Sequence, residues 1–396
     1  MLTLNYTQEI LNLQDVEVEK VENFEKTQRI YIKLGRKVVN CPCCKAETSK
    51  IHDYRTQVVK DCEAFGKRIE LVLRKRRYVC TSCNKRFAEP NTFLPKYHRM
   101  TSRLVGTVVD KLSDERSFTS VARETGLSVS TVIRIFDHVQ YPRIKVCPDV
   151  LSIDEFKGNT GGEKYNVILC DAKHKRVLDI LPKRKESYLI NYFKQTDRSN
   201  VKYFVSDMWT TYSEISANFF KNATFLVDKY HWIRQVIWAF EAVRKETQKH
   251  LKSDVRKYFK RSRSLLIKRY EYLSPEDKVA VNNMLWYSSE ISEAHSIKEW
   301  FFAILDNDDL DMAKDDLITW LNSVHTSDLQ PFKRCVNTFF NWKNGIVNSF
   351  DAPYTNGFTE GCNNKIKVLK RNAYGYRRFD RFRNRILHIF SHQNAA

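Results

Sequence analysis

Two short cysteine pairs constrain what the N-terminal third of this chain can fold into more than any other feature. Cys41 and Cys44 form one C-x-x-C pair, and Cys80 and Cys83 form a second. Four thiolates in two such pairs are typical of a closed, tetrahedral zinc site. Cys43 crowds the first pair and could replace one of its ligands. The spacing therefore predicts a structural Zn²⁺ that holds two hairpins together.

Extended segments surround the cysteine pairs. Apolar residues alternate over residues 15–40 in the manner of a hairpin, and a second extended run covers residues 69–73. The interval between the pairs is long for a zinc ribbon, so the intervening residues are expected to form strands. We predict a zinc-ribbon-like N-terminal domain over residues 1–95, with buried free cysteines as the alternative.

A helix-turn-helix pattern follows. Ala122 and Gly126 lie four residues apart, Ser128 is placed as a helix N-cap, and Val132 is apolar ten residues after the alanine. This spacing supplies a small residue at the helix crossing, a glycine turn and a core position in the second helix. We predict a DNA-binding domain over residues 96–145, with an ordinary helical hairpin as the alternative. The candidate DNA-contacting side chains are Ser128, Ser130, Thr131 and Arg134.

The charge of the chain indicates a polyanionic partner. The 396 residues contain 67 Lys and Arg against 47 Asp and Glu, a formal net charge of +20. Nucleic acid is the first candidate, and an anionic membrane surface is the rival. Residues 1–13 lack the features of a signal peptide, and no apolar run approaches the roughly 18 residues that span a bilayer. The expected location is therefore the cytoplasm, without a membrane partner.

A change of periodicity after residue 146 predicts a second kind of domain. Three strands follow one another, and then helix, strand, helix and strand, which matches the order of a ribonuclease-H-like fold over residues 146–235. In that fold the first and fourth strands are neighbours. Asp154 and Asp207, each expected just past its strand, would then stand side by side. Paired carboxylates repel unless a divalent cation neutralises them, so Mg²⁺ or Mn²⁺ is expected there.

A third carboxylate is expected from a helix packed on that sheet. Glu360 is the candidate, on a helix that begins near Thr359 within a final segment of the core over residues 346–396. Glu360 shares one helical face with Lys367 and Arg371, which could contact phosphates. A first-turn partner of the helix dipole is the structural alternative for Glu360.

A mostly helical stretch over residues 236–345 interrupts the predicted core. Within residues 244–269 there are eleven Lys and Arg residues, against Glu246 and Asp254. This segment is either a solvated helical face or a phosphate-binding surface. The expected architecture is thus multidomain α+β: a zinc-ribbon-like domain, a helix-turn-helix and a ribonuclease-H-like α/β core with a helical insertion.

These motifs together resemble the DDE transposases of bacterial insertion sequences, specifically the ISL-three family. The segments that carry the resemblance are the cysteine pairs, the helix-turn-helix, Ser152-Ile-Asp154-Glu-Phe156, Val205-Ser-Asp207-Met-Trp209, Tyr354-Thr-Asn-Gly-Phe-Thr-Glu360-Gly-Cys-Asn-Asn-Lys365 and the stretch from Lys370 to Tyr376. Their order and spacing agree over nearly the whole chain.

The resemblance implies a function. Asp154, Asp207 and Glu360 would be the DDE triad of a two-metal mechanism that cleaves DNA and transfers strands. The N-terminal domains would recognise the terminal inverted repeats of the element in double-stranded DNA. Asp228 and His231 resemble an Asp/Cys-x-x-His motif of related transposases and are secondary candidates. Because two element ends must meet, a homodimer or a higher oligomer on DNA is expected, in the bacterial cytoplasm at the nucleoid.

Two other functions share most of these residues. One is a zinc and helix-turn-helix regulator whose core no longer reacts. The other is a nuclease that cuts DNA but never joins it. The intact acidic triad argues against the regulator, whereas only a joined product separates the nuclease from a transposase.

Overall fold

The computed structural model describes residues 9–261 and 263–393. The chain forms two compact units. The first unit comprises the residues up to Tyr141 together with residues 367–376 and the segment from Asp380 onward, and the second comprises residues 142–366 and 377–379. Among the described helices, none combines the length and the apolar character needed to cross a bilayer. Most of the N-terminal segment 1–13, considered above as a possible leader, lies outside the described residues.

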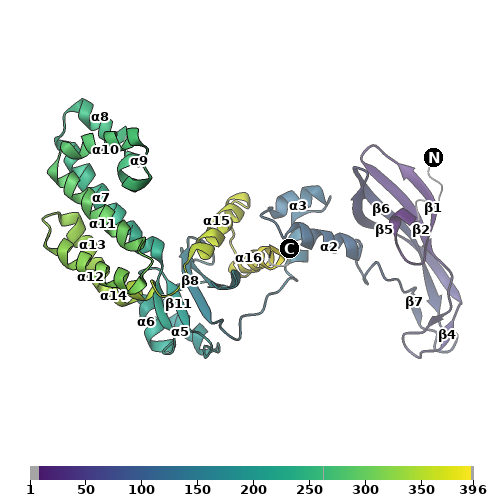
Figure 1. Cartoon of the computed structure of the whole chain (residues 1–396). Helices are drawn as coiled ribbons and strands as arrows, with labels where there is room; N and C mark the ends of the chain where they lie inside the picture. The colour runs from purple at the N-terminus through teal and green to yellow at the C-terminus, as the bar shows by residue number, and fades with distance from the viewer. Residues whose placement is uncertain (1–8, 262, 394–396) are drawn as a thin grey trace. The chain divides into compact units, whose positions relative to one another are not determined.

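A five-stranded sheet begins the first unit (Figure 1). The strands of this part of the chain are β1 (Val16–Asn23), β2 (Thr27–Leu34), β3 (Val39–Asn40), β4 (Glu47–Thr48), β5 (Ile51–Ala64), β6 (Lys67–Val79) and β7 (Arg86–Ala88). The order in the sheet is β1-β2-β6-β5, and β7 also pairs with β6. The predicted hairpin is confirmed, because β1 and β2 pair antiparallel. Ile30, Ile32, Leu71 and Leu73 alternate along their strands and are buried in a common core.

Three helices follow, and their local sequence explains where they turn. They are α2 (Ser102–Lys111), α3 (Phe118–Glu124) and α4 (Val129–Phe136). Gly126 has a φ of +64°, a left-handed conformation that glycine adopts without steric cost, and this forms the turn between α3 and α4. Ser128 caps α4, since its Oγ accepts a hydrogen bond from the Thr131 N–H at 3.2 Å. Ala122 and Val132 are buried as predicted.

The C-terminal helices divide between the two units. They are α15 (Gly357–Asn372) and α16 (Phe379–Gln393). In the first unit, Arg381 on α16 makes two hydrogen bonds to Asp137, at 2.8 and 2.7 Å. Buried Arg385 donates to the carbonyls of Asp114 and Arg116, both at 2.9 Å. These contacts group most of α16 with the helix-turn-helix, so the compact units and the predicted segment 346–396 do not coincide.

The second unit contains another five-stranded sheet. Its elements are β8 (Val150–Phe156), β9 (Asn166–Asp171), β10 (Arg176–Leu181), α5 (Glu186–Lys194), β11 (Tyr203–Ser206), α6 (Thr210–Phe219) and β12 (Thr224–Val227). The strand order is β10-β9-β8-β11-β12. The first three strands of this sheet are antiparallel, whereas β8, β11 and β12 run parallel. The predicted adjacency of the first and fourth strands is therefore confirmed.

Asp154 lies inside its strand, and the prediction that it follows the strand was wrong. The ladder between β8 and β9 continues through Asp154 to Phe156, which pairs with Asn166. Asp207 does directly follow β11, as predicted. Because side chains alternate along a strand, Asp154 shares a face with Val150 and Ser152, whereas Leu151 and Ile153 face the core formed with α5 and α6.

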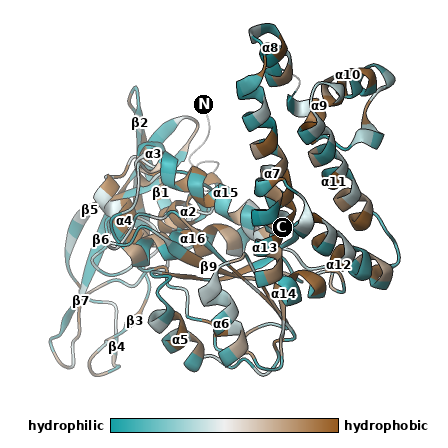
Figure 2. Cartoon of the chain, turned by 90° about the vertical axis from the view of Figure 1, so that its left-hand side faces the viewer, coloured by the Kyte–Doolittle hydropathy of each residue, from teal (hydrophilic) through white to brown (hydrophobic). Residues whose placement is uncertain are grey.

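The predicted helical insertion is helical throughout most of its described length. Its helices are α7 (Lys229–His250), α8 (Ser253–Arg261), α9 (Arg263–Ile267), α10 (Pro275–Trp286), α11 (Ser289–Leu305), α12 (Leu310–Thr326), α13 (Gln330–Asn341) and α14 (Lys343–Asn348), with a short 3₁₀ turn at Tyr270–Tyr272. Large aromatic side chains fill its interior: Trp232, Phe301, Trp320 and Phe339 are fully buried and contact one another. Figure 2 shows the hydrophobic segments on these helices. The long helix α7 begins immediately after Asp228 and so connects the insertion to the sheet.

Candidate functional site

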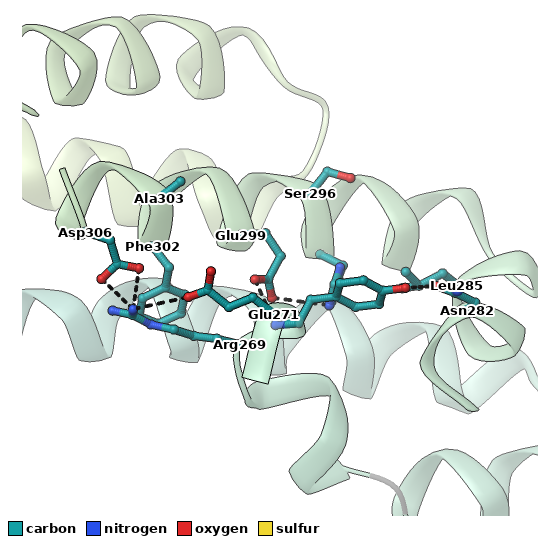
Figure 3. A pocket seen from close by; sticks show the side chains of 11 residues that line it. Arg269, Glu271, Asn282, Leu285, Ser296, Glu299, Phe302, Ala303 and Asp306 are labelled. Atoms are coloured by element: carbon teal, nitrogen blue, oxygen red, sulfur yellow. Dashed lines mark hydrogen bonds and ion pairs between the residues drawn. The ribbon is translucent and has the colours of Figure 1, made fainter. Parts of the chain in front are cut away.

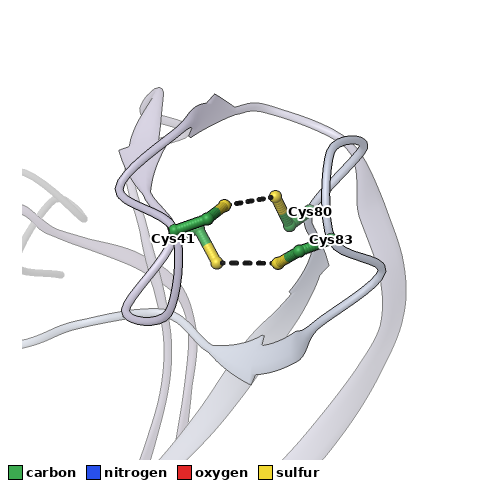
Figure 4. A group of neighbouring side chains, drawn as sticks. Cys41, Cys80 and Cys83 are labelled. Atoms are coloured by element: carbon green, nitrogen blue, oxygen red, sulfur yellow. Dashed lines mark hydrogen bonds between the residues drawn. The ribbon is translucent and has the colours of Figure 1, made fainter.

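The four cysteines of the two C-x-x-C pairs converge (Figure 4). The Sγ atoms of Cys41 and Cys83 are 3.6 Å apart, and those of Cys44 and Cys80 are 3.5 Å apart. All four Sγ atoms lie within 4.8 Å of one another. Tetrahedral zinc with Zn–S bonds of about 2.3 Å requires sulfurs roughly 3.8 Å apart, so the four side chains fit Zn²⁺. Four thiolates leave no open position, which makes the site structural.

Cys43 supports this site with its backbone. Its side chain is exposed and is not among the four converging sulfurs, whereas its N–H points at Cys41 Sγ, 3.4 Å away. Backbone N–H groups of Cys83 and Ser82 lower the pKa of Cys80 to about 6. Because the thiolate is the form that binds metal, these N–H groups favour zinc binding at neutral pH. The alternative in which Cys43 replaces a ligand is not what the structure shows.

The residues predicted to contact DNA lie within the first unit. Ser128 and Ser130 are exposed, as is Arg134, whereas Thr131 is half-buried. The Ser128 hydroxyl already accepts the capping hydrogen bond from the Thr131 N–H, and it also contacts the Thr131 hydroxyl at 2.8 Å. It is therefore used within the helix terminus. Arg371, near the end of α15, lines a groove of about 700 Å³ together with residues 114–117 and Ser120 of the helix-turn-helix. Arg371 and the start of α3 therefore belong to one surface.

Asp154 is held in place at the centre of the second sheet. Its Oδ1 accepts a hydrogen bond from the Glu155 N–H at 2.7 Å, and its Oδ2 accepts one from Asn363 Nδ2 at 2.8 Å. Burial, together with the charges of Asp207, Glu155 and Glu360, raises the pKa of Asp154 to about 7. Asp207 and Glu360 thus each lie within electrostatic range of Asp154. Their repulsion is what a divalent cation relieves.

The neighbouring Glu155 has a different environment. Both of its carboxylate oxygens accept hydrogen bonds from Arg184 Nη1, at 2.7 and 2.9 Å. Arg184 also lies over the rings of Tyr165 and Trp209. Glu155 therefore has a cationic partner, whereas Asp154 forms no ion pair with any described residue. Of these two adjacent acids, Asp154 is thus the one whose carboxylate is available to a metal ion.

A polar network anchors the start of α15 to the sheet. Ser152 Oγ donates to Asn356 Oδ1 at 2.6 Å and contacts Thr359 Oγ1 at 2.7 Å. The Asn356 N–H donates to Asp228 Oδ1 at 2.9 Å. Because Ser152, Asn356 and Thr359 are all buried, these bonds are shielded from water and fix the first turn of the helix. Glu360 follows directly and is thereby held near Asp154.

The secondary candidates Asp228 and His231 lie beside Glu360. His231 Nε2 is 3.6 Å from Glu360 Oε1 and 3.9 Å from Asp228 Oδ2. Ligand atoms of Asp228, His231 and Glu360 all lie within 4.8 Å of one another, a grouping that could hold a metal ion. His231 is half-buried, so its ring is accessible from this group. Burial raises the pKa of Asp228 and also that of Asp207.

The donor set fits a hard divalent cation. Within the described residues, Asp207 Oδ1 and Asp228 Oδ2 are buried without a hydrogen-bond partner. Buried carboxylate oxygens normally have partners, and leaving them unpaired is costly. Oxygen ligands from several carboxylates are the set that Mg²⁺ and Mn²⁺ prefer. Asp207 and Asp228, which directly follow β11 and β12, are thus suited to hold a metal ion of that class.

A separate pocket of about 390 Å³ lies in the helical insertion (Figure 3). Its charged side chains are paired: Arg269 pairs with Asp306 and lies 3.9 Å from Glu271, and Glu299 pairs with buried Lys298, which is not part of the lining. Tyr270 donates to Asn282 at 3.1 Å. These internal pairs indicate a structural role for the pocket's polar residues.

Sequence reasoning missed Asn356 and Asn363. Both lie inside the segment that was singled out for Glu360, yet an asparagine carries no charge and has many surface roles, so neither was chosen. One signal could have found Asn363: three residues after Glu360 on a helix, its side chain is on nearly the same face. The role of Asn356 depends on long-range contacts to Ser152 and Asp228, which spacing does not reveal.

Comparison with known proteins defines the class of this chain. A family model described as a transposase matches residues 151–386, more than half of the sequence. A helix-turn-helix domain of transposase family ISL3 matches residues 89–140, and the zinc finger of the transposases of IS204, IS1001, IS1096 and IS1165 matches residues 37–83. The chain belongs to transposase family ISL3, as the sequence motifs had indicated.

Two curated proteins are similar to this chain. The transposase for insertion sequence element IS1001 of Bordetella parapertussis is 27% identical over 380 residues, which cover 91% of each chain. An ATP-dependent protease of Lactococcus lactis subsp. lactis is 44% identical over 64 residues, 16% of this chain and 20% of the protease. The first match spans all three predicted regions, whereas the second is confined to a short segment.

Proposed function

We propose that this chain is the transposase of a bacterial insertion sequence, which cleaves DNA at the ends of the element and transfers the strands to a target. The observation that carries the proposal is the buried Asp154 on β8, which neighbours the strand that ends before Asp207 and is hydrogen-bonded to Asn363 of the helix that bears Glu360. The strand order β10-β9-β8-β11-β12 supports a ribonuclease-H-like core that the helical insertion interrupts. Membership in the transposase family supports the choice of reaction.

In the proposed two-metal mechanism, Asp154, Asp207 and Glu360 hold Mg²⁺ or Mn²⁺. The bound ions would activate the attacking oxygen and stabilise the leaving 3′ oxygen. Asn363 orients the Asp154 carboxylate through its hydrogen bond to Oδ2, and Asn356 holds the helix that bears Glu360. Water attacks the phosphodiester at the element end, and its P–O3′ bond breaks to leave a 3′-OH. That 3′-OH then attacks a target phosphodiester and displaces the 3′ oxygen of the target strand. Asp228 and His231 are proposed to position this site from its other side.

The first unit is proposed to bind the terminal inverted repeats. Ser130 and Arg134 are the exposed side chains of α4 that would reach base edges, and Arg371 would contact phosphate. Lys367 is proposed for the same phosphate-binding role on α15. Since two element ends must be brought together, the acting form is at least a homodimer on DNA.

A cleavage and joining assay tests this function. Labelled duplexes that carry the two element ends are mixed with the protein, Mg²⁺ and a target plasmid, beside Asp154→Ala. We expect cleavage at the ends and joined products, both reduced at least about a thousandfold in the variant because an essential ion ligand is lost. DNA binding should survive in Asp154→Ala.

The two alternatives give different products in the same assay. A silent regulator would bind the ends tightly without any metal-dependent cut. A nuclease would cut the ends and leave the plasmid free of joined strands. Cleavage by Asp154→Ala at the rate of the unsubstituted protein would show that the triad is misassigned.

A further inference from the structure

The basic segment 244–269 of the insertion is not uniform, because several of its cations are already paired. Arg244 and Arg263 both bind Glu241, each at 2.6 Å. Lys249 binds Glu246 at 2.7 Å, and Arg269 pairs with Asp306. These cations are used within the protein, so their positive charge is largely compensated.

A second group of cations has no such partners. Arg256, Lys257, Lys260 and Arg261 are all exposed on α8, and none forms an ion pair with any residue in the described ranges 9–261 and 263–393. At 100° per residue they occupy an arc of about 140° of the helix. Two i, i+4 rows result, in which the cations are about 6 Å apart along the axis. Asp254 is the one acidic residue of this helix.

The opposite side of α8 is fixed to the protein. Phe259 is fully buried, with its ring 6.3 Å from that of Tyr287, and Val255 packs against the core of the insertion. Figure 2 shows hydrophilic and hydrophobic segments alternating along α8, as this arrangement requires. The four cations therefore project outward from a helix whose other side is packed, and we call them the α8 basic face.

We propose that the α8 basic face binds the phosphate backbone of double-stranded DNA without regard to sequence. This inference rests on the proposed function, which makes DNA the substrate, and it assigns the insertion a DNA contact distinct from the helix-turn-helix. Four cations without an ion-pair partner on one helical face would attract the phosphates of a duplex. Lys and Arg side chains are among the groups that contact phosphate oxygens, and such contacts carry no sequence information.

The surface favours a duplex over an anionic membrane. Membrane-surface helices insert an apolar face beside their cations. In α8 that apolar face, Val255 and Phe259, is packed into the insertion. Attraction to a bilayer would then depend on charge alone, whereas a duplex also presents its phosphates as a convex row that a straight helix can follow.

A salt titration with two matched variants tests the proposal. The test variant carries Arg256→Gln, Lys257→Gln, Lys260→Gln and Arg261→Gln. The control variant carries Lys194→Gln, Lys202→Gln, Lys221→Gln and Arg334→Gln, which are exposed cations elsewhere in the second unit. Each variant loses four positive charges. Affinity of the full chain for a duplex without element ends is measured by fluorescence anisotropy over about 50 to 200 mM salt, without divalent ions.

We expect the test variant to bind at least about tenfold more weakly near 0.1 M salt, with the slope of log K against log salt smaller by about 3 to 4. The control should change less than about threefold, because scattered charges act only through the overall field. Equal slopes in the two variants would overturn the proposal. Loss of binding to phosphatidylserine vesicles with unchanged DNA binding would also overturn it, in favour of a membrane contact.

Circular dichroism and thermal melting of both variants verify that the helices are intact. The binding readout does not involve cleavage. If the unsubstituted protein fails to cut element ends but the test variant still loses DNA affinity, the proposed function fails and the α8 basic face stands. In the reverse case, the unsubstituted protein cuts element ends normally and the test variant keeps its affinity and salt slope. That result refutes only the DNA-binding role of the α8 basic face.

Discussion

Replacing Asp154 by asparagine is expected to stabilise the metal-free protein while it abolishes DNA cleavage. Burial and neighbouring carboxylates raise the pKa of Asp154 to about 7, so its charged form is disfavoured in the folded state. The native protein binds this proton more tightly than the unfolded chain. Stability therefore falls as pH rises from about 4 to about 7 and remains lowered above that range. Asparagine carries no charge, so the loss of stability at higher pH does not occur in the variant.

The local hydrogen bonds can accommodate the substitution. Asn363 Oδ1 is buried without a partner among the described residues, so rotation of the Asn363 amide would let it accept from the new side-chain NH₂. The Glu155 N–H can still donate to the remaining oxygen. We expect Asp154→Asn to raise the free energy of unfolding by about 2 to 4 kcal/mol at pH 8 in the presence of a chelator. Urea denaturation at pH 5 and pH 8 measures this, and the difference should shrink at pH 5.

Asp171→Asn is the matched control for this prediction. Asp171 is also a buried aspartate of the same sheet, but hydrogen bonds from His174 and Arg176 outweigh burial and lower its pKa. Its removal should destabilise the protein at pH 8, the opposite sign. If Asp154→Asn were instead as destabilising as Asp171→Asn without divalent ions, the cluster of repelling carboxylates would not exist in solution.

Loss of one zinc ligand has the second large expected effect. Cys80→Ser should reduce bound zinc from one equivalent to nearly none, because the closed site needs four protein ligands and a serine hydroxyl is a poor substitute for a thiolate. The core of Ile30, Ile32, Leu71 and Leu73 does not include the site, so the main sheet should persist. Hydrogen exchange should therefore increase in residues 37–50 and 79–88, and binding to element ends should weaken.

Cys43→Ser is the matched control for the zinc site. Cys43 lies between the two ligands of the first pair, yet its exposed side chain is not one of the four converging sulfurs. It should retain one equivalent of zinc and normal exchange. Equal zinc loss in Cys43→Ser and Cys80→Ser, or retention of zinc by both, would contradict the assignment of ligands.

The order of elements could be predicted from the sequence because it depends on local patterns. Alternating apolar residues located β1 and β2, and the small residue, glycine and N-cap of the helix-turn-helix located α3 and α4. The adjacency of β8 and β11 also followed from the order of strands and helices. The first two signals lie within a few residues of the features that they predict, whereas the strand adjacency depends on the fold class that the order of elements indicates.

Features that depend on distant contacts could not be predicted. The extent of β8 was misjudged because Asp154 reads as a polar strand end, whereas its pairing with β9 carries the strand on to Phe156. The grouping of α16 with the helix-turn-helix depends on Arg381 and Asp137, which are 244 residues apart. Likewise the anchoring of α15 by Asn356 requires partners more than a hundred residues away.

Metal-specific rescue of an Asp207→Cys variant tests most directly whether Asp207 holds the ion used in DNA cleavage. Asp207 Oδ1 is buried and lacks a hydrogen-bond partner among the described residues, so a thiolate at this position would take the place of an ion ligand. Sulfur ligands bind Mg²⁺ poorly and softer divalent ions better. We predict that Asp207→Cys cleaves element-end duplexes with Mn²⁺ but not with Mg²⁺, and that Asp207→Ala is inactive with both. Cleavage by Asp207→Cys that is equal in the two metals, or Mn²⁺ rescue of Asp207→Ala to the same extent, would contradict the assignment of Asp207 as a metal ligand.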